Sequence, residues 1–127
     1  MGKKKLYMIG SAHLDTVWEW TLETTVEKFL PRTFEENFAL LDEFPHFVFG
    51  WEGAFRYELL EEYYPELFRR LKRYVKKGKW APIGSSYENG DVNQPSPEAI
   101  FRNIIYGQDY FQKKLGVRSN DIFLPDC

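Results

Sequence analysis

Short apolar runs alternate with longer amphipathic segments along this chain. The runs at 5–12, 46–51 and 80–84 are rich in strand-forming residues and end at small or polar residues, which predicts three buried strands. A further apolar run begins at Asp121 and predicts a fourth strand that stops at Asp126. The segments between these runs are therefore the candidates for helices.

Apolar residues recur at helical spacing in those segments. Proline, serine and glycine mark where the helices start, break and stop. The predicted helical regions are 22–44 with Pro31 as a kink or restart, 53–78 with two segments that meet at Pro65, and 97–115 between an N-cap at Ser96 and a terminator at Gly116.

This order of elements predicts an α/β fold, with a parallel sheet of about four strands and crossover helices. In parallel folds the functional side chains gather where the strands end, at the carboxyl edge of the sheet. Four polar groups follow predicted strands and should converge there: His13 with Asp15, Trp51 with Glu52, the segment 85–91, and Asp126.

The predicted sheet is too small to close into a barrel, which needs about eight strands. We therefore expect residues 1–127 to be a single, incomplete domain, the first part of a (β/α) barrel-like catalytic domain. The alternative is an open sandwich of sheet and helices. In either case an uncovered sheet edge favours self-association, so a homo-oligomer is one possible assembly.

Composition narrows the classes of function. The 127 residues carry 17 basic and 19 acidic side chains, so nothing in the charge favours nucleic acid or an anionic membrane as a partner, and the basic stretch 69–79 is interpreted as a solvated helix face. A single cysteine excludes an intrachain disulfide framework and fits a reducing compartment. The apolar run near the N-terminus is too short for a signal peptide or a membrane span, so the cytoplasm is the expected location.

His13 and Asp15 are the first candidates for chemistry. Side chains two positions apart in an extended segment share a face, so this imidazole and carboxylate can bind one metal ion. Asp126, at the end of another strand on the same edge, is a geometrically reasonable third ligand. The alternative for a lone His-x-Asp is a hydrogen bond that stabilises the loop.

Three stretches carry a family resemblance: "AHLDTVWEW", "GSSYENGDVNQPSPEAIFRNIIYGQDYF" and the terminal "FLPDC". Together they resemble the N-terminal catalytic domain of the α-mannosidases of glycoside hydrolase family 38, over residues 6–127. The resemblance implies a zinc-dependent, retaining hydrolase of α-mannosides. It implies that His13, Asp15 and Asp126 bind zinc, that Asp126 is also the catalytic nucleophile, and that Trp18 offers an apolar surface to the sugar.

The chain is much shorter than members of that family, which continue for several hundred residues and supply another histidine ligand and a general acid/base further on. We therefore expect the 127-residue chain to hydrolyse little on its own. His46 precedes a predicted strand and so lies at the other end of the sheet from the site.

Four further polar or aromatic residues have either a functional or a structural interpretation. Glu88 and Asp91 are candidates for orienting the ligands or the substrate, and the alternative is turn chemistry around Asn89, Gly90 and Asn93. Trp51 and Glu52 are candidates for the pocket rim, and a core tryptophan is at least an equal alternative.

Two other classes of function compete with the mannosidase. One is a non-catalytic α/β module that pairs through its exposed sheet edge. The other is a metal-dependent carbohydrate deacetylase, which also uses histidine and aspartate at the rim of an α/β barrel but needs more histidines than the two in this chain.

Overall fold

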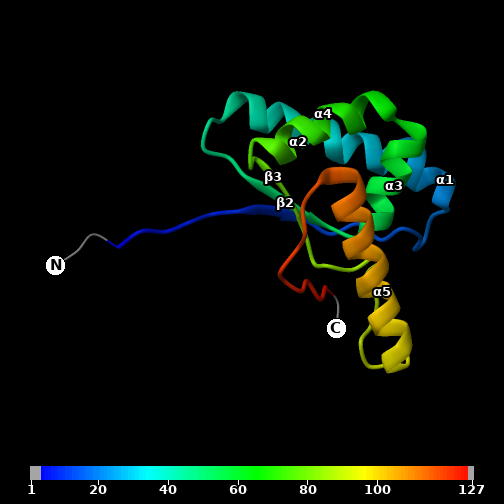
Figure 1. Ribbon diagram of the computed structural model, residues 1–127. Coiled ribbons are helices and arrows are strands. Elements are labelled where there is room, and N and C mark those ends of the chain that lie inside the picture. The colour runs from blue at the N-terminus through cyan, green and yellow to red at the C-terminus, as the bar shows by residue number, and fades with distance from the viewer. Residues whose placement is uncertain (1–3, 126–127) are drawn as a thin grey trace.

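The structure is a computed structural model that describes residues 4–125. A three-stranded parallel sheet, in the order β1-β2-β3, lies beside a group of helices, so the predicted α/β class is confirmed (Figure 1). The elements are β1 (Gly10–Ala12), α1 (Leu22–Thr24), the π-helical turn η1 (Thr25–Phe29), α2 (Leu30–Glu43), β2 (Phe49–Glu52), α3 (Ala54–Tyr63), α4 (Pro65–Lys76), β3 (Trp80–Ile83), α5 (Pro97–Tyr110) and the π-helical turn η2 (Phe111–Leu115).

The first strand is shorter than predicted. Only residues 10–12 pair with β2, and the side chains of residues 6–9 are exposed. The reason is the partner: β2 begins at Phe49, opposite Gly10, so residues before Gly10 have no paired strand beside them in this sheet. Figure 1 shows this part of the chain running away from the rest of the molecule.

The prediction of a fourth strand is wrong for the described part of its segment: residue 121 is a bend, residues 122–124 have no regular secondary structure and residue 125 is in a turn. Side-chain contacts replace strand pairing there. The hydroxyl of Ser85 donates to the carbonyl of Asp121 at 2.6 Å, and the backbone N–H of Ser85 donates to the hydroxyl of Ser119 at 3.1 Å. Asp126 and Cys127 lie outside the described residues. The larger barrel and the single incomplete domain remain predictions.

The helix boundaries agree with the proline and glycine signals. α3 and α4 meet at Pro65, and Ser96 caps α5 by accepting a hydrogen bond from the N–H of Ala99 at 3.3 Å. The kink expected at Pro31 takes the form of the wide turn η1 just before it, in which the N–H of Leu30 bonds to the carbonyl of Thr25. Proline has no N–H to donate, so a widened turn ahead of it absorbs the irregularity.

The core is a cluster of aromatic rings between β2, β3 and the helices. Phe34 of α2 stacks on Trp80 with ring centroids 5.0 Å apart and meets Trp51 edge-on at 4.9 Å. Because side chains alternate along a strand, Phe49 and Trp51 face this core while Gly50 and Glu52 point to the opposite side of the sheet. Burial of Trp51 and Trp80 therefore fixes which way Glu52 points.

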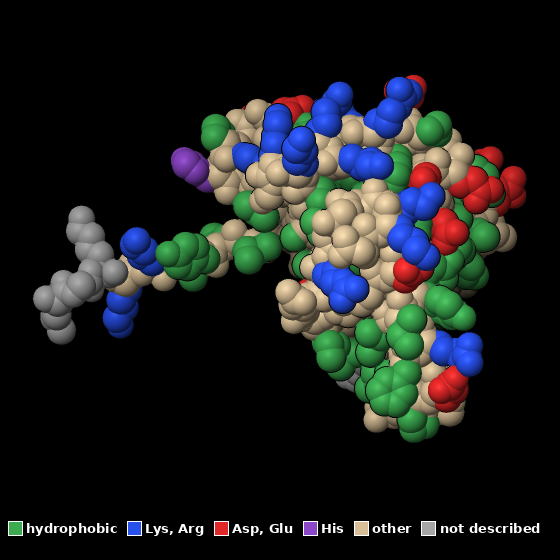
Figure 2. All heavy atoms as spheres, viewed as in Figure 1, with side chains coloured by type: hydrophobic (Ala, Val, Ile, Leu, Met, Phe, Trp, Pro, Cys, Tyr) green, Lys and Arg blue, Asp and Glu red, His purple; other side chains and the backbone are tan. Residues whose placement is uncertain are grey.

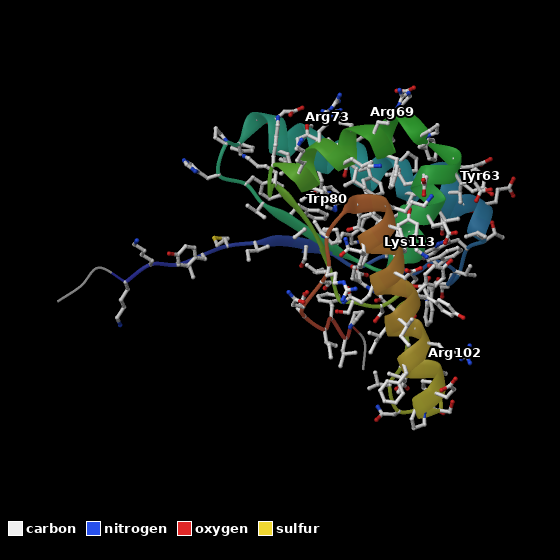
Figure 3. The ribbon with its side chains drawn as sticks, in the orientation of Figure 1. Tyr63, Arg69, Arg73, Trp80, Arg102 and Lys113 are labelled. Atoms are coloured by element: carbon white, nitrogen blue, oxygen red, sulfur yellow. The ribbon has the colours of Figure 1, made fainter. Side chains whose placement is uncertain are left out.

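The basic side chains of the stretch 69–79 lie on the solvated face of α4 and in the turn that follows it, as predicted. Figure 2 shows blue side chains gathered over the upper part of the molecule, and Figure 3 shows Arg69 and Arg73 directed outward, whereas Trp80 lies inside the fold. The apolar side of α4 packs inward through Phe68, Leu71 and Tyr74.

Candidate functional site

His13 and Asp15 lie just beyond the carboxyl end of β1, where the sequence places them. The Nε2 atom of His13 is 3.3 Å from Oδ1 of Asp15, and the two side chains are 25% and 41% exposed. A tetrahedral zinc ion bound at about 2.1 Å by each atom would hold such a nitrogen and oxygen about 3.4 Å apart. The spacing and donor chemistry of this pair therefore fit zinc.

Glu52 comes from the neighbouring strand to the other side of the His13 ring. β1 and β2 pair in a register that sets Ala12 opposite Trp51, so the next residues, His13 and Glu52, follow at the same level. Oε1 of Glu52 lies 3.2 Å from Nδ1 of His13 and accepts a hydrogen bond from the side-chain amide of Asn89 at 2.6 Å. The imidazole thus lies between two carboxylates.

Arg56, near the start of α3, ties the backbone between His13 and Asp15 to the loop after β3. Its side chain is 1% exposed, its Nε donates to the carbonyl of Leu14 at 2.7 Å, and its Nη1 donates to Glu88 at 2.8 Å. The hydroxyl of Thr16 donates to the second oxygen of Glu88 at 2.5 Å. The predicted metal-ligand loop is therefore held at two points.

Glu88 is in turn fixed by α5. Its backbone N–H donates to the side-chain oxygen of Asn103 at 2.8 Å, and its carbonyl accepts from the amide nitrogen of Asn103 at 2.7 Å. The polar segment after β3 is thus a structured loop, with Glu88 34% exposed and pointing to the loop that carries His13 and Asp15.

Asp91 lies in a different local setting. It is exposed, and its Oδ1 accepts a hydrogen bond from the backbone N–H of Asn93 at 2.7 Å. This is the turn contact that the second interpretation of Asp91 expects. Orientation of ligands or substrate by Glu88 and Asp91 remains a prediction.

Trp18, Trp20 and Trp51 lie in three different environments. Trp18 is 69% exposed in the bends that follow Asp15, Trp51 is fully buried in the core, and the indole N–H of Trp20 donates to Thr25 at 2.8 Å. An exposed ring next to the ligand loop is available to a sugar, and the role of Trp18 as a sugar platform remains a prediction.

A hollow of about 290 Å³ opens beside these residues, lined by Asp15, Thr16, Val17, Arg56, Glu88 and Asn89. A neighbouring hollow of about 330 Å³ shares Glu88 and Asn89 with it and continues toward α5 and Ile122. Within residues 4–125 no three His, Cys, Asp or Glu side chains form a metal-binding group. Asp126, the predicted third ligand and nucleophile, lies outside that part of the chain.

Two tyrosines under the site stay protonated. Burial raises the pKa of Tyr57, whose hydroxyl donates to the carbonyl of Trp51 at 2.7 Å. Burial, and a hydrogen bond to the carboxylate of Glu58, raise the pKa of Tyr87. Both hydroxyls therefore act as hydrogen-bond donors: Tyr57 donates to Trp51 of β2, and Tyr87, in the loop after β3, donates to Glu58 of α3.

Sequence patterns missed Arg56, Asn89 and Thr16 as supports of the site. Arg56 occupies a buried helix position that an apolar residue normally fills, and helical spacing alone gives it no distinction. Glu52 was recognised only as a rim candidate, although an acidic residue directly after a buried strand was a usable signal.

The fold and the site define an α/β chain with an imidazole and several carboxylates at the carboxyl edge of a parallel sheet. The model of the glycosyl hydrolases family 38 N-terminal domain matches residues 3–127, and the chain belongs to this family. The resemblance found in the sequence motifs is thereby confirmed.

Curated relatives agree with that assignment. The chain is 36% identical over 122 residues to alpha-mannosidase G of Dictyostelium discoideum, covering 96% of this chain and 11% of that protein. It is 31% identical over 121 residues to alpha-mannosidase 2C1 of Homo sapiens, covering 95% and 12% respectively. It is 32% identical over 122 residues to an alpha-mannosidase of Saccharomyces cerevisiae, covering 95% and 11%. The chain thus spans about one ninth of the length of these relatives.

Among the described residues, no helix has both the length and the apolar character needed to cross a membrane.

Proposed function

We propose that this chain is part of a zinc-dependent, retaining α-mannosidase, and that it forms one side of the sugar-binding site. Membership of glycosyl hydrolase family 38 and the names of the relatives support a glycoside hydrolase that acts on mannose-containing glycans. Because the chain spans only 11% to 12% of those relatives, hydrolysis by the whole protein is part of the proposal.

One observation carries the proposal: Nε2 of His13 and Oδ1 of Asp15 face each other at 3.3 Å at the carboxyl end of β1. A histidine nitrogen and a carboxylate oxygen at this separation suit one zinc ion. We propose Asp126 as the third ligand, on the sequence motif that contains it.

Bound zinc would act as a Lewis acid toward the 2- and 3-hydroxyls of the mannose ring. Carboxyl side chains carry out the bond-making and proton-transfer steps. Asp126 attacks the anomeric carbon, the bond from that carbon to the leaving oxygen breaks, and a second carboxyl group protonates the leaving oxygen. Water, deprotonated by that second carboxylate, then attacks the anomeric carbon and breaks its bond to Asp126, so mannose leaves with its configuration retained. Trp18 covers the apolar face of the sugar.

A zinc titration by calorimetry tests the metal site. Replacing His13 or Asp15 with alanine should weaken zinc binding by more than about tenfold, because each change removes a ligand. His46→Ala is the matched control: this histidine is exposed ahead of β2, and its loss should leave the affinity unchanged. Equal zinc affinity in the wild type and in H13A would reject the proposal.

Ligand-observed NMR tests the sugar. The zinc-loaded chain should bind methyl α-mannoside more tightly than methyl α-glucoside, because the 2- and 3-hydroxyls are cis in mannose and trans in glucose, and a metal chelates a cis pair more easily. Trp18→Ala should weaken mannoside binding without changing zinc affinity. Any hydrolysis of an aryl α-mannoside should be lost in D126A. Equal binding of the two sugars would contradict the proposed preference of this site for mannose.

A further inference from the structure

We propose that Glu52 is a positioning residue that fixes the tautomer of His13, keeping the proton on Nδ1 and the lone pair of Nε2 directed at the metal position beside Asp15. This inference rests on the proposed function of His13 as a metal ligand. It adds a residue that belongs to no sequence motif of the site.

The contacts of Glu52 decide where the His13 proton lies. Oε1 of Glu52 acts as an acceptor, because it already accepts a hydrogen bond from the side-chain amide of Asn89 at 2.6 Å. Nδ1 of His13, 3.2 Å from the same oxygen, must therefore be the donor in the neutral ring. Nε2 is then the unprotonated nitrogen.

The opposite side of the ring shows why this tautomer suits a cation. With its proton on Nδ1, the lone pair of Nε2 faces Oδ1 of Asp15 at 3.3 Å, so two acceptor atoms oppose each other. That arrangement is unfavourable when nothing positive lies between them and favourable when a cation bridges them. A loop-stabilising hydrogen bond would instead place the proton on Nε2.

The burial of Glu52 argues against a packing role. The side chain is 0% exposed, and its Oε2 is buried without a hydrogen-bond partner among the described residues. Burying a carboxyl oxygen without a hydrogen-bond partner is unfavourable in general. An apolar side chain could fill the same space without that penalty, so the carboxyl group points to a task. A carboxyl group on the outer nitrogen of a ligating histidine raises the basicity of the ring and fixes its orientation.

The wild-type chain without metal gives the first test. Long-range ¹H–¹⁵N correlation NMR, at a pH where imidazole is neutral, reports the protonated nitrogen, and the chain has only two histidines, with His46 as an internal reference. We expect the proton of His13 on Nδ1. A proton on Nε2 would overturn the inference, and this measurement requires no variant to fold.

Two substitutions then separate positioning from packing. In Glu52→Ala, Asp15 remains the carboxylate beside the ring, so the proton should move to Nε2 and zinc affinity should fall about 10- to 100-fold. In Glu52→Gln the amide oxygen can still accept from Nδ1, so the wild-type tautomer should persist and the loss of zinc affinity should be smaller. Glu62→Ala removes an exposed carboxylate of α3 and controls for the change in net charge.

The outcomes distinguish this inference from the proposed function. If H13A abolishes zinc binding while E52A and E52Q keep the wild-type tautomer and affinity, Glu52 is not a positioning residue and the metal site stands. If H13A leaves zinc binding unchanged, the metal site itself fails, and the inference that rests on it fails too.

Discussion

The buried guanidinium of Arg56 donates two hydrogen bonds to the backbone carbonyl of Leu14, the residue between His13 and Asp15. A side chain of α3 thereby holds the turn that sets both candidate ligands in place. Its third contact, to Glu88, connects the same turn to the loop after β3. Three segments far apart in the sequence are thus joined by one residue.

Replacing Arg56 with methionine should lower the free energy of unfolding by about 3 kcal/mol, because breaking a buried ion pair leaves polar partners unsatisfied. The estimate is at the lower end of the usual range since Glu88 is 34% exposed and can be partly solvated. Zinc affinity should fall as well, because the turn that carries His13 and Asp15 loses its support. Urea denaturation and zinc titration measure the two effects.

Glu88→Gln serves as the control for that prediction. The amide keeps the shape and one acceptor oxygen for Arg56, and the site is partly solvated, so the loss should stay below about 1.5 kcal/mol. If R56M and E88Q lower the free energy of unfolding equally, the hydrogen bonds from Arg56 to the carbonyl of Leu14 contribute nothing to stability.

Tyr57 connects two buried tryptophans. Its hydroxyl donates to the carbonyl of Trp51 at 2.7 Å and accepts from the indole N–H of Trp80 at 2.9 Å. Tyr57→Phe removes both bonds and leaves a buried N–H and a buried carbonyl unsatisfied, so we expect a loss of about 2 kcal/mol in unfolding free energy. Tyr63→Phe, on the exposed side of α3, should change it by less than about 0.5 kcal/mol. Similar values for the two variants would contradict this account.

Much of the fold follows from local sequence signals. Pro65, Ser96 and Gly116 act within a few residues of where they stand, so the helix ends they mark were predictable. The pairing of His13 with Asp15 was also predictable, because spacing along one extended segment determines it.

The remainder depends on partners distant in sequence. The length of β1 is limited by where β2 begins, and the segment after Ser119 bonds to Ser85 by side chains instead of forming a strand. Neither feature could be predicted from the apolar runs at 5–12 and 121–126 alone. Likewise, the burial of Glu52 and Arg56 follows from strand register and helix packing, so composition identified neither as a contact of the His13 loop.

Gly107 of α5 lets the loop that carries Glu88 approach closely. A Cβ atom at this position would lie within 3.0 Å of backbone atoms of Ser85, Ser86 and Tyr87. Gly107→Ala should therefore cost up to about 3 kcal/mol through overpacking, of which better helix propensity recovers about 1 kcal/mol. We expect a net loss of about 2 kcal/mol, together with weaker zinc binding.

Gly90→Ala is the matched control, since nothing lies within 4 Å of its Cβ position. Its effect on the unfolding free energy should stay within about 0.5 kcal/mol. Equal stability of G107A and the wild type would mean that the loop after β3 can move away from α5 without loss.

Asp42 links α2 to α4 and should make stability depend on pH. Its carboxylate accepts from the hydroxyl of Tyr74 and from the guanidinium of Arg70, both at 2.5 Å, and these bonds lower the pKa of Asp42 below its ordinary value. A carboxyl group whose pKa is lower in the folded state adds stability above its unfolded pKa, about 3.9. That contribution is lost as the pH falls through the folded value.

The melting temperature of the wild type should therefore exceed that of Asp42→Asn at neutral pH, and the difference should shrink as the pH drops below about 4. Salt should reduce it too, because Asp42 and Arg70 are partly exposed. Asp109→Asn removes a surface carboxylate that bonds to Lys113, four residues along the chain. Its melting temperature should differ less from that of the wild type at neutral pH, because Asp109→Asn breaks no bond to a tyrosine hydroxyl. A difference for D42N that persists unchanged in acid would mean that it does not arise from the ionised carboxylate, and that the charge of Asp42 contributes nothing to the packing of α2 on α4.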